Sequence, residues 1–455
     1  MSGPDGSVLP ADPETDSATE RARLAALDTF AERRFGMFVH WGLYSLAARH
    51  EWMRQRERMP RDEYRRYADY FDPDLYDPET WAQAAADAGM RYAVLTTKHH
   101  DGFCLWDTEQ TDFSVRATPH RSDLVGPFVE AFRGRGLGVG FYHSLLDWDH
   151  PQFPIDGLHP QARDVSVEDD AARAENVGRD VARYRSYLHA QVIELLSRYE
   201  PDTLWFDFSY AEHNHLGDPV WAGKGPQEWG SNELLGIIRR LRPGCLVNDR
   251  LGIPGDFRTA EQYQPAQAIR QGGRLVPWEA CQTLNGSWGY DRDNTDFKSP
   301  DLLVRMLIDT VAKGGNLLLN VGPDGRGRFE PAALDTLAAI GRWMSLHSRA
   351  IHGAGPSDWR PPTDCRYTRR GNRLYLHLFA WPYEAVHLPG LAGRVRYAQF
   401  LHDASQVRTE VLPPGHESAL TDVTDGGALT LWLPVHRPDV AVPVIELFLA
   451  AEDGA

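Results

Sequence analysis

The sequence predicts a (β/α)8-like barrel followed by a small C-terminal β-sandwich. Short apolar runs rich in Val, Leu and Phe alternate with amphipathic stretches of helical length, a pattern typical of parallel βα units. Nearly every run begins apolar and ends polar, and barrels of this kind carry their chemistry at the carboxyl ends of the strands. After residue 353 the pattern changes to short alternating strands with Pro and Gly turns, which is typical of a sandwich.

Eight strands and the helices between them account for the barrel. The strands are expected at 35–42, 91–100, 137–145, 202–209, 245–250 and 316–323, with weaker candidates at 256–263 and 277–284. Amphipathic stretches at 78–90, 123–136, 184–199 and 232–244 predict helices. An open doubly wound sheet is the alternative, but no GxGxxG follows the first strand to bind a dinucleotide.

These elements divide the chain into three parts. Residues 1–25, rich in Pro, Gly, Ser and acids, predict a flexible N-terminal tail. Residues 26–353 form the expected barrel, and residues 354–455 form the expected sandwich, with strands at 372–381, 428–434 and 442–449. A long polar segment over 147–177 either shapes a substrate site or is an inert surface excursion.

Composition narrows the classes of partner. The 455 residues include 64 acidic and 48 basic ones, and the net charge of −16 argues against nucleic acid. No signal peptide is recognisable and no run of about 18 apolar residues exists, so we expect no membrane segment and a cytoplasmic location. The four scattered cysteines lack CxxC spacing and are expected to be buried, reduced thiols. The oligomeric state is left open.

The stretch "DTLWFDFSY", 202–210, places an acid in the middle of an apolar strand. Alternation predicts that Trp205 and Asp207 share the face toward the barrel mouth, whereas Phe206 and Phe208 pack against helices. A pair of carboxylates across a pocket is what glycosidic bond cleavage requires. Five carboxylates are candidates at strand ends: Glu51, Asp207, Asp249, Glu261 and Glu279.

Histidines and tryptophans gather at the same strand ends. His40, His99, His100 and His143 could converge as a metal site or could bind hydroxyl groups as neutral imidazoles. Tryptophan faces stack on the apolar side of sugar rings. Seven tryptophans lie within or beside the polar strand ends: Trp41, Trp52, Trp106, Trp148, Trp205, Trp278 and Trp288.

Eight ordered segments resemble the α-L-fucosidases of glycoside hydrolase family 29. They are "RFGMFVHWGLYSLAARHEWM", "YAVLTTKHHDGFCLWDT", "GFYHSLLDW", "DTLWFDFS", "VNDR", "GDFRTAEQ", "WEACQTLNGSWGY" and "GGNLLLNVGPDGRG", and they span roughly residues 30–350. The resemblance implies a retaining exo-glycosidase that removes terminal α-L-fucose from fucosylated oligosaccharides or glycoconjugates, without a metal or cofactor. Alternatives are an exo-glycosidase for a fucose-like sugar on a natural product, an inactive sugar-binding protein, and a metal-dependent barrel hydrolase.

The resemblance also implies roles for particular residues. Asp207 matches the nucleophile, and Glu261 is the better match for the acid/base, with Glu279 as the alternative. The sugar pocket would be lined by His40, Glu51, Trp52, His99, His100, Tyr142, His143, Trp205, Arg250 and Trp288. The chain departs from the usual pattern at Ala260 (commonly Pro), His143 (often Tyr) and Phe208 (often Gly), which leaves the linkage preference open.

Overall fold

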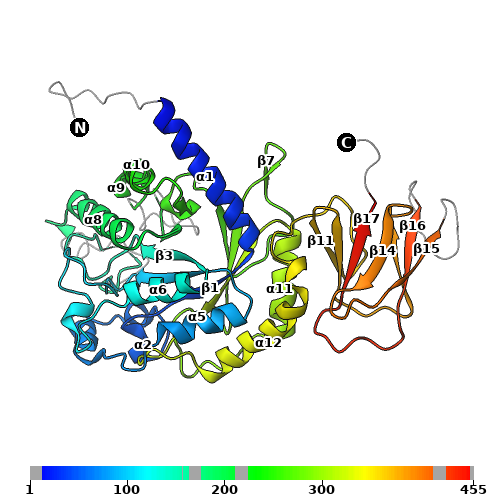
Figure 1. The fold of residues 1–455 in the computed structure, drawn as a ribbon. Helices are drawn as coiled ribbons and strands as arrows, with labels where there is room; N and C mark the ends of the chain where they lie inside the picture. Colours follow the sequence, from blue (N-terminus) through cyan, green and yellow to red (C-terminus); the bar gives the residue numbers. More distant parts are fainter. Residues whose placement is uncertain (1–12, 156, 163–175, 211–223, 413–426, 451–455) are drawn as a thin grey trace.

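A barrel-like domain with outer helices stands beside a smaller all-β domain (Figure 1). The structure is a computed structural model, and it describes residues 13–155, 157–162, 176–210, 224–412 and 427–450. The pattern changes from alternating helices and strands to antiparallel strands between the two domains. The last short helix of the barrel domain ends at Ala350, and the first strand of the β domain begins at Cys365.

Eight parallel strands form the barrel, and every predicted strand is present. Their order is β5-β4-β3-β2-β1-β10-β9-β6. The edge strands β5 and β6 meet through an isolated parallel bridge between Asn248 and Phe257, so the sheet curls round on itself. The strands are β1 (Phe35–Val39), β2 (Tyr92–Lys98), β3 (Gly138–Ser144), β4 (Thr203–Asp207), β5 (Leu246–Val247), β6 (Arg258–Glu261), β9 (Trp278–Thr283) and β10 (Asn316–Val321).

Helices cover the outside of this sheet, as the amphipathic stretches predict. Several begin at a side-chain cap: Asp77 accepts from the backbone of α5, Asp180 from that of α8 and Ser299 from that of α11. The helices are α2 (Tyr44–Ala47), α3 (Met53–Arg56), α4 (Arg61–Arg65), α5 (Pro78–Asp87), α6 (Val125–Gly134), α8 (Val181–Tyr199), α9 (Pro226–Trp229), α10 (Ser231–Leu241), α11 (Pro300–Ala312) and α12 (Pro331–His347). Short 3-10 helices are η1 (Arg66–Tyr70), η2 (Val115–Ala117), η4 (Asp249–Leu251) and η5 (Ser348–Ala350).

Strand alternation separates two apolar clusters. Leu204 and Phe206 belong to the large cluster between sheet and helices, whereas Trp205 belongs to a smaller cluster inside the barrel. The inner cluster also contains Phe38, Tyr92, Val94, Tyr142, Leu246, Phe257, Cys281 and Leu318. The barrel is therefore filled with side chains, and the polar ends of its strands lie above this filling.

The C-terminal domain is a sandwich of two antiparallel sheets around a shared core. One sheet has the order β11-β12-β17-β14 and the other β13-β16-β15. Leu374, Leu376 and Ile445 from the first sheet pack with Leu388 and Leu431 from the second. The strands are β11 (Cys365–Arg370), β12 (Arg373–Leu378), β13 (Ala385–Pro389), β14 (Val395–Phe400), β15 (Arg408–Leu412), β16 (Ala428–Trp432) and β17 (Val444–Leu449). A small hairpin, β7 (Arg270–Gln271) and β8 (Arg274–Leu275), projects from the barrel domain.

The N-terminal region differs from the predicted tail. Helix α1 spans Pro13–Arg33, so residues 13–25 of the predicted tail are helical, whereas residues 1–12 lie outside the described residues. Ala, Glu, Arg and Leu after Asp16 are good helix formers, and their propensity outweighs the Pro and Gly of the first residues. Phe30, near the end of α1, packs into the inner cluster of the barrel. Among the described helices, none is long and apolar enough to cross a membrane.

The polar segment after β3 is fixed by a buried ion pair. Lys98 Nζ lies 3.2 Å from Asp147 Oδ2, with both side chains at most 2% exposed, and donates to Gln191 at 3.0 Å. Residues 156 and 163–175 of the predicted 147–177 segment lie outside the described residues. Its described start supports the mouth of the barrel, because Trp148 packs edge-to-face on Trp52.

We expect Lys98→Met to lower the free energy of unfolding by about 3–5 kcal/mol, because Asp147 would be left buried without its cation. Urea unfolding measures this loss. The double variant Lys98→Met, Asp147→Asn removes both charges and should recover part of it. A loss below about 1 kcal/mol for the single variant would show that the pair is not a buried constraint.

Candidate active site

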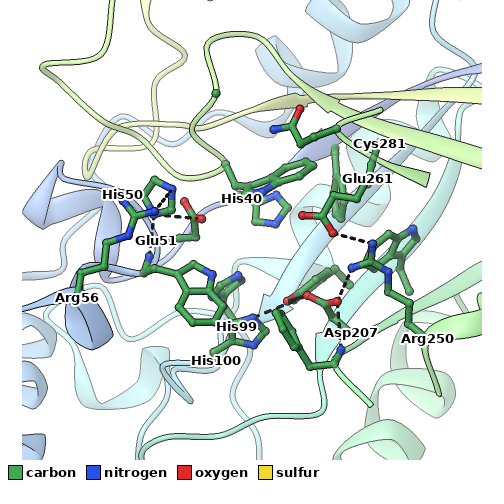
Figure 2. A pocket seen from close by; sticks show the side chains of 18 residues that line it. His40, His50, Glu51, Arg56, His99, His100, Asp207, Arg250, Glu261 and Cys281 are labelled. Atoms are coloured by element: carbon green, nitrogen blue, oxygen red, sulfur yellow. Dashed lines mark hydrogen bonds and ion pairs between the residues drawn. The ribbon is translucent and has the colours of Figure 1, made fainter. Parts of the chain in front are cut away.

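A pocket of about 390 Å³ opens at the carboxyl ends of the barrel strands (Figure 2). This volume lies at the low end for small-molecule sites, and fits one sugar ring better than a chain. Of the residues predicted to contact substrate or carry out catalysis, most line it. They are His40, Glu51, Trp52, His99, His100, Tyr142, Trp205, Asp207, Arg250, Glu261 and Trp288.

Asp207 is the last residue of β4, and hydrogen-bond donors surround its carboxylate. Its side chain is 10% exposed. Oδ1 accepts from Arg250 Nη1 at 2.7 Å and from the backbone N–H of Phe208 at 3.2 Å, and Oδ2 accepts from the Tyr142 hydroxyl at 2.8 Å. These donors compensate the desolvation of a carboxylate in an otherwise apolar strand.

One guanidinium joins the two candidate catalytic carboxylates. Arg250 Nη2 lies 2.6 Å from Glu261 Oε2, while Nη1 binds Asp207. Burial lowers the pKa of Arg250, but the charges of Asp207 and Glu261 outweigh it and raise that pKa overall. Two carboxylates that share one guanidinium lie close together, on neighbouring sides of the same pocket (Figure 2).

Neutral imidazoles also line the pocket, and that of His100 lies beside Asp207, with Nε2 3.8 Å from Oδ2. Burial lowers the pKa of His40 and of His100 to about 3, and holds the pKa of His99 well below its ordinary value. β2 ends at Lys98, so His99 and His100 both turn toward the pocket, with ring centroids 4.2 Å apart. None of these three imidazoles carries a charge at neutral pH, which suits them to hydroxyl groups.

Hydrogen bonds fix which ring nitrogen carries the proton. Asn320 donates its amide N–H to the Trp288 carbonyl, so its oxygen accepts from His40 Nδ1 at 2.6 Å. Ser144 donates to the Leu146 carbonyl at 2.7 Å, so its oxygen accepts from His100 Nδ1 at 2.6 Å. In both histidines Nε2 is left as an acceptor for a substrate hydroxyl.

Glu51 is a second acid in the pocket, apart from the pair on Arg250. Its side chain is fully buried, and Oε2 accepts from the Gly289 N–H at 2.8 Å. Oε1 lies 3.2 Å from His50 Nδ1. Burial raises the pKa of Glu51 to about 7, although the Gly289 hydrogen bond lowers it. Glu51 therefore changes charge near neutral pH.

Two predicted site residues do not line the pocket. His143 is fully buried, next to the pocket-lining Tyr142 on β3, and packs against Trp106 instead, because adjacent strand residues face opposite sides. The structure therefore does not bring His143 into the pocket with the other predicted residues. Glu279, the alternative acid/base, lies inside the barrel and accepts from the Tyr92 hydroxyl and the Trp205 indole.

The tryptophans divide between pocket and core. Trp52, Trp205 and Trp288 line the pocket, whereas the other four predicted near strand ends are at most 1% exposed and belong to the large core cluster. Those four are Trp41, Trp106, Trp148 and Trp278. Position at a strand end therefore predicted a place in the pocket correctly for three of the seven tryptophans.

Several pocket residues were not predicted. Phe208 was expected to face the helices, but β4 ends at Asp207 and Phe208 has a φ of +59°, so its ring turns into the pocket and contacts His100 edge-to-face. His50 and Arg56 come from the segment after β1, where neighbouring Glu51 and Trp52 were a signal for them. Other lining residues are Phe38, Gln262, Cys281 and Gly286.

In the part of the chain that the structure describes, no three His, Cys, Asp or Glu side chains are placed to hold a metal ion. Cys104, Cys245, Cys281 and Cys365 are all buried free thiols, as predicted. Burial raises the pKa of the Cys281 thiol in the pocket well above its ordinary value, so it is neutral there.

A sugar-sized pocket at the mouth of a (β/α)8-like barrel, lined by two neighbouring carboxylates and by neutral imidazoles, defines a glycoside hydrolase. The family model for α-L-fucosidase matches residues 10–349. The chain belongs to the α-L-fucosidase family, as its motifs predicted.

Known relatives cover most of the chain. It is 31% identical to the tissue α-L-fucosidase of Homo sapiens over 389 residues, which are 78% of this chain and 76% of that protein. Among solved structures, α-L-fucosidase isoenzyme 1 from Paenibacillus thiaminolyticus is 40% identical with a TM-score of 0.84, over 94% of this chain and 100% of that one. A Bacteroides thetaiotaomicron GH29 α-L-fucosidase has a TM-score of 0.79 at 26% identity, over 94% of this chain and 96% of that one. That structure is a trapped covalent intermediate with 2-fluoro-fucosyl fluoride.

We expect Glu51 to make stability fall as pH rises. Its pKa is raised from 4.5 to about 7 on folding, so its contribution is fully present below about pH 4.5 and is lost as pH rises through 7. Relative to Glu51→Gln, the wild type should lose about 3 kcal/mol between pH 4.5 and pH 8. Unfolding measured at several pH values tests this, with exposed Glu63→Gln as the reference for losing one surface carboxylate. A difference that does not change with pH contradicts it.

Proposed function

We propose that this protein hydrolyses terminal α-L-fucosides with retention of configuration, with Asp207 as the nucleophile and Glu261 as the acid/base. The single observation that carries the assignment is the shared guanidinium: Arg250 binds both carboxylates, which supports the short separation that double displacement requires. Membership of the α-L-fucosidase family supports fucose as the sugar. The trapped covalent intermediate of the Bacteroides relative supports retention.

The two carboxylates differ in exposure in the way their roles require. Asp207 is 10% exposed, deep beside the pocket floor, whereas Glu261 is 37% exposed, nearer the mouth through which a leaving group departs. Asp207 attacks the anomeric carbon while Glu261 donates a proton to the leaving oxygen. A water then attacks the fucosyl ester, Glu261 accepts its proton, and Asp207 leaves as a carboxylate.

The rest of the pocket holds the sugar during both steps. Nε2 of His40 and of His100 accepts from sugar hydroxyl groups, and the Trp52, Trp205 and Trp288 rings offer apolar faces for its C–H groups. Glu279 does not touch this space, which favours Glu261 as the acid/base. A fucosylated glycan or glycoside is the implied substrate, and the cytoplasmic location stays a prediction.

Replacing the nucleophile should abolish turnover. We expect Asp207→Ala to hydrolyse 4-nitrophenyl α-L-fucoside at least 10³-fold more slowly than the wild type, because no covalent intermediate can form. Azide should occupy the vacated space and give β-L-fucosyl azide. The product anomer, read by NMR, is the measurement. Substantial residual hydrolysis without azide would exclude Asp207 as the nucleophile.

Replacing the acid/base should give the opposite azide product. Glu261→Ala should lose about 10²–10³-fold of its kcat/KM on a fucosyl disaccharide and much less on the 4-nitrophenyl substrate, whose leaving group needs little protonation. Azide should then attack the covalent intermediate and give α-L-fucosyl azide. If Glu261→Ala lost both substrates equally and gave no azide product, while Glu279→Ala did so, the assignment would be reversed. A panel of fucosylated oligosaccharides then defines the linkage.

A further inference from the structure

Glu279 lies one layer beneath the floor of the pocket. It is 1% exposed on β9, and Cys281, two residues further along the same strand and facing the same way, lines the pocket. Two residues along a strand advance about 6.6 Å, so the Glu279 carboxyl starts that much deeper in the barrel. A group at this depth has no contact with a leaving oxygen and cannot protonate it.

The carboxyl is held by two side-chain donors. The Tyr92 hydroxyl donates to Oε2 at 2.5 Å, and the Trp205 indole N–H donates to Oε1 at 3.1 Å. Among the described residues, no ion pair includes Glu279. Burial raises its pKa to about 7, which shows the cost of charge at this place, although both hydrogen bonds lower it. An apolar side chain would fill the space without that cost. The presence of a carboxyl here is therefore explained by the side chains whose hydrogen bonds it accepts.

Glu279 holds the Trp205 indole, and the two side chains that donate to Asp207 pack against this ring. Tyr142 stacks on Trp205 with centroids 5.7 Å apart and planes 23° apart, and the Arg250 guanidinium lies 4.7 Å from the Trp205 ring centroid. Tyr142 and Arg250 are the side chains that donate to Asp207, and Arg250 also binds Glu261. A tilt of the indole therefore displaces the donors of both carboxylates together.

We propose that Glu279 is a positioning residue for the reaction proposed above: it anchors the Trp205 indole, which places Tyr142 and Arg250 around Asp207 and Glu261. The proposal rests on the proposed function, since it assigns Glu279 a part in the same turnover. The effect passes through the indole N–H, so it depends on an acceptor at position 279 and not on a proton given to the substrate.

Two variants of Glu279 separate this role from acid/base catalysis. In Glu279→Gln, the amide oxygen still accepts from Trp205, so we expect kcat to fall no more than about fivefold. Glu279→Leu leaves the indole without an acceptor, and kcat should fall about 10–100-fold with KM changed less than threefold. The factor should be the same for 4-nitrophenyl α-L-fucoside and a fucosyl disaccharide, and azide should not restore it.

A matched control exists outside the pocket. Glu194 also accepts a buried indole N–H, from Trp106 at 3.0 Å, and neither residue lines the pocket. Glu194→Leu should lower the melting temperature yet leave kcat within twofold of the wild type. Melting temperatures of all variants show whether each is folded at the assay temperature. If Glu279→Leu is unfolded there, Glu279→Gln still tests the proposal.

A double-mutant cycle tests the route through the indole. Trp205→Phe keeps an aromatic ring but removes the N–H, so adding Glu279→Gln or Glu279→Leu to it should lower kcat by less than twofold. Full additivity in the cycle would overturn the proposal, as would a folded Glu279→Leu with wild-type kcat. Azide rescue with a leaving-group-dependent loss would instead make Glu279 the acid/base. A wild type without fucosidase activity would overturn the proposed function, and this inference with it.

Discussion

The salt bridges of Arg250 to Asp207 and Glu261 are the interaction on which the site depends. The guanidinium comes from η4, directly after the two-residue strand β5, and it links the end of β4 to the end of β6. At this seam β5 and β6 are joined by an isolated bridge instead of a full ladder. The charges needed to hold two carboxylates side by side therefore also help to close the barrel where its backbone pairing is weakest.

Side chains complete the seam in place of backbone pairing. The amide of Asn248, just beyond β5, donates to the Phe206 carbonyl and accepts from the Phe206 N–H at 2.9 Å each, and so extends the pairing of β4. Asp249 accepts from both the backbone and the hydroxyl of Thr259 on β6. Because β5 stops early, the chain from 248 to 250 is available to present side chains inward, and the short strand is the reason that Arg250 can reach both carboxylates.

The number and positions of the barrel strands were predictable because hydrophobic periodicity reports burial directly, and all eight strands follow it. The same alternation placed Trp205 on the inner face and Phe206 on the outer one correctly. Applied to Tyr142 and His143, it would have excluded His143 from the pocket. The depth of a residue along the barrel was not predictable in this way. Glu261 and Glu279 both resemble acids at strand ends, but the depth of each depends on where its strand begins, which periodicity does not report. The left-handed conformation of Phe208 was also not predictable from the sequence pattern, because tertiary packing sets it.

The turn at Phe208 also helps to explain how Asp207 is stabilised at the end of an apolar strand. A bulky residue with φ near +59° costs about 1–3 kcal/mol, and it persists where the surroundings hold it in place. Here the Phe208 ring packs against His100 and Trp52, and the turned backbone directs its N–H to Asp207 Oδ1. Among the described residues, Oδ1 thus accepts from two donors, whereas Oδ2 accepts from the Tyr142 hydroxyl and lies 3.8 Å from His100 Nε2. These donors are therefore spread unevenly over the carboxylate, and Oδ2 accepts fewer of them than Oδ1.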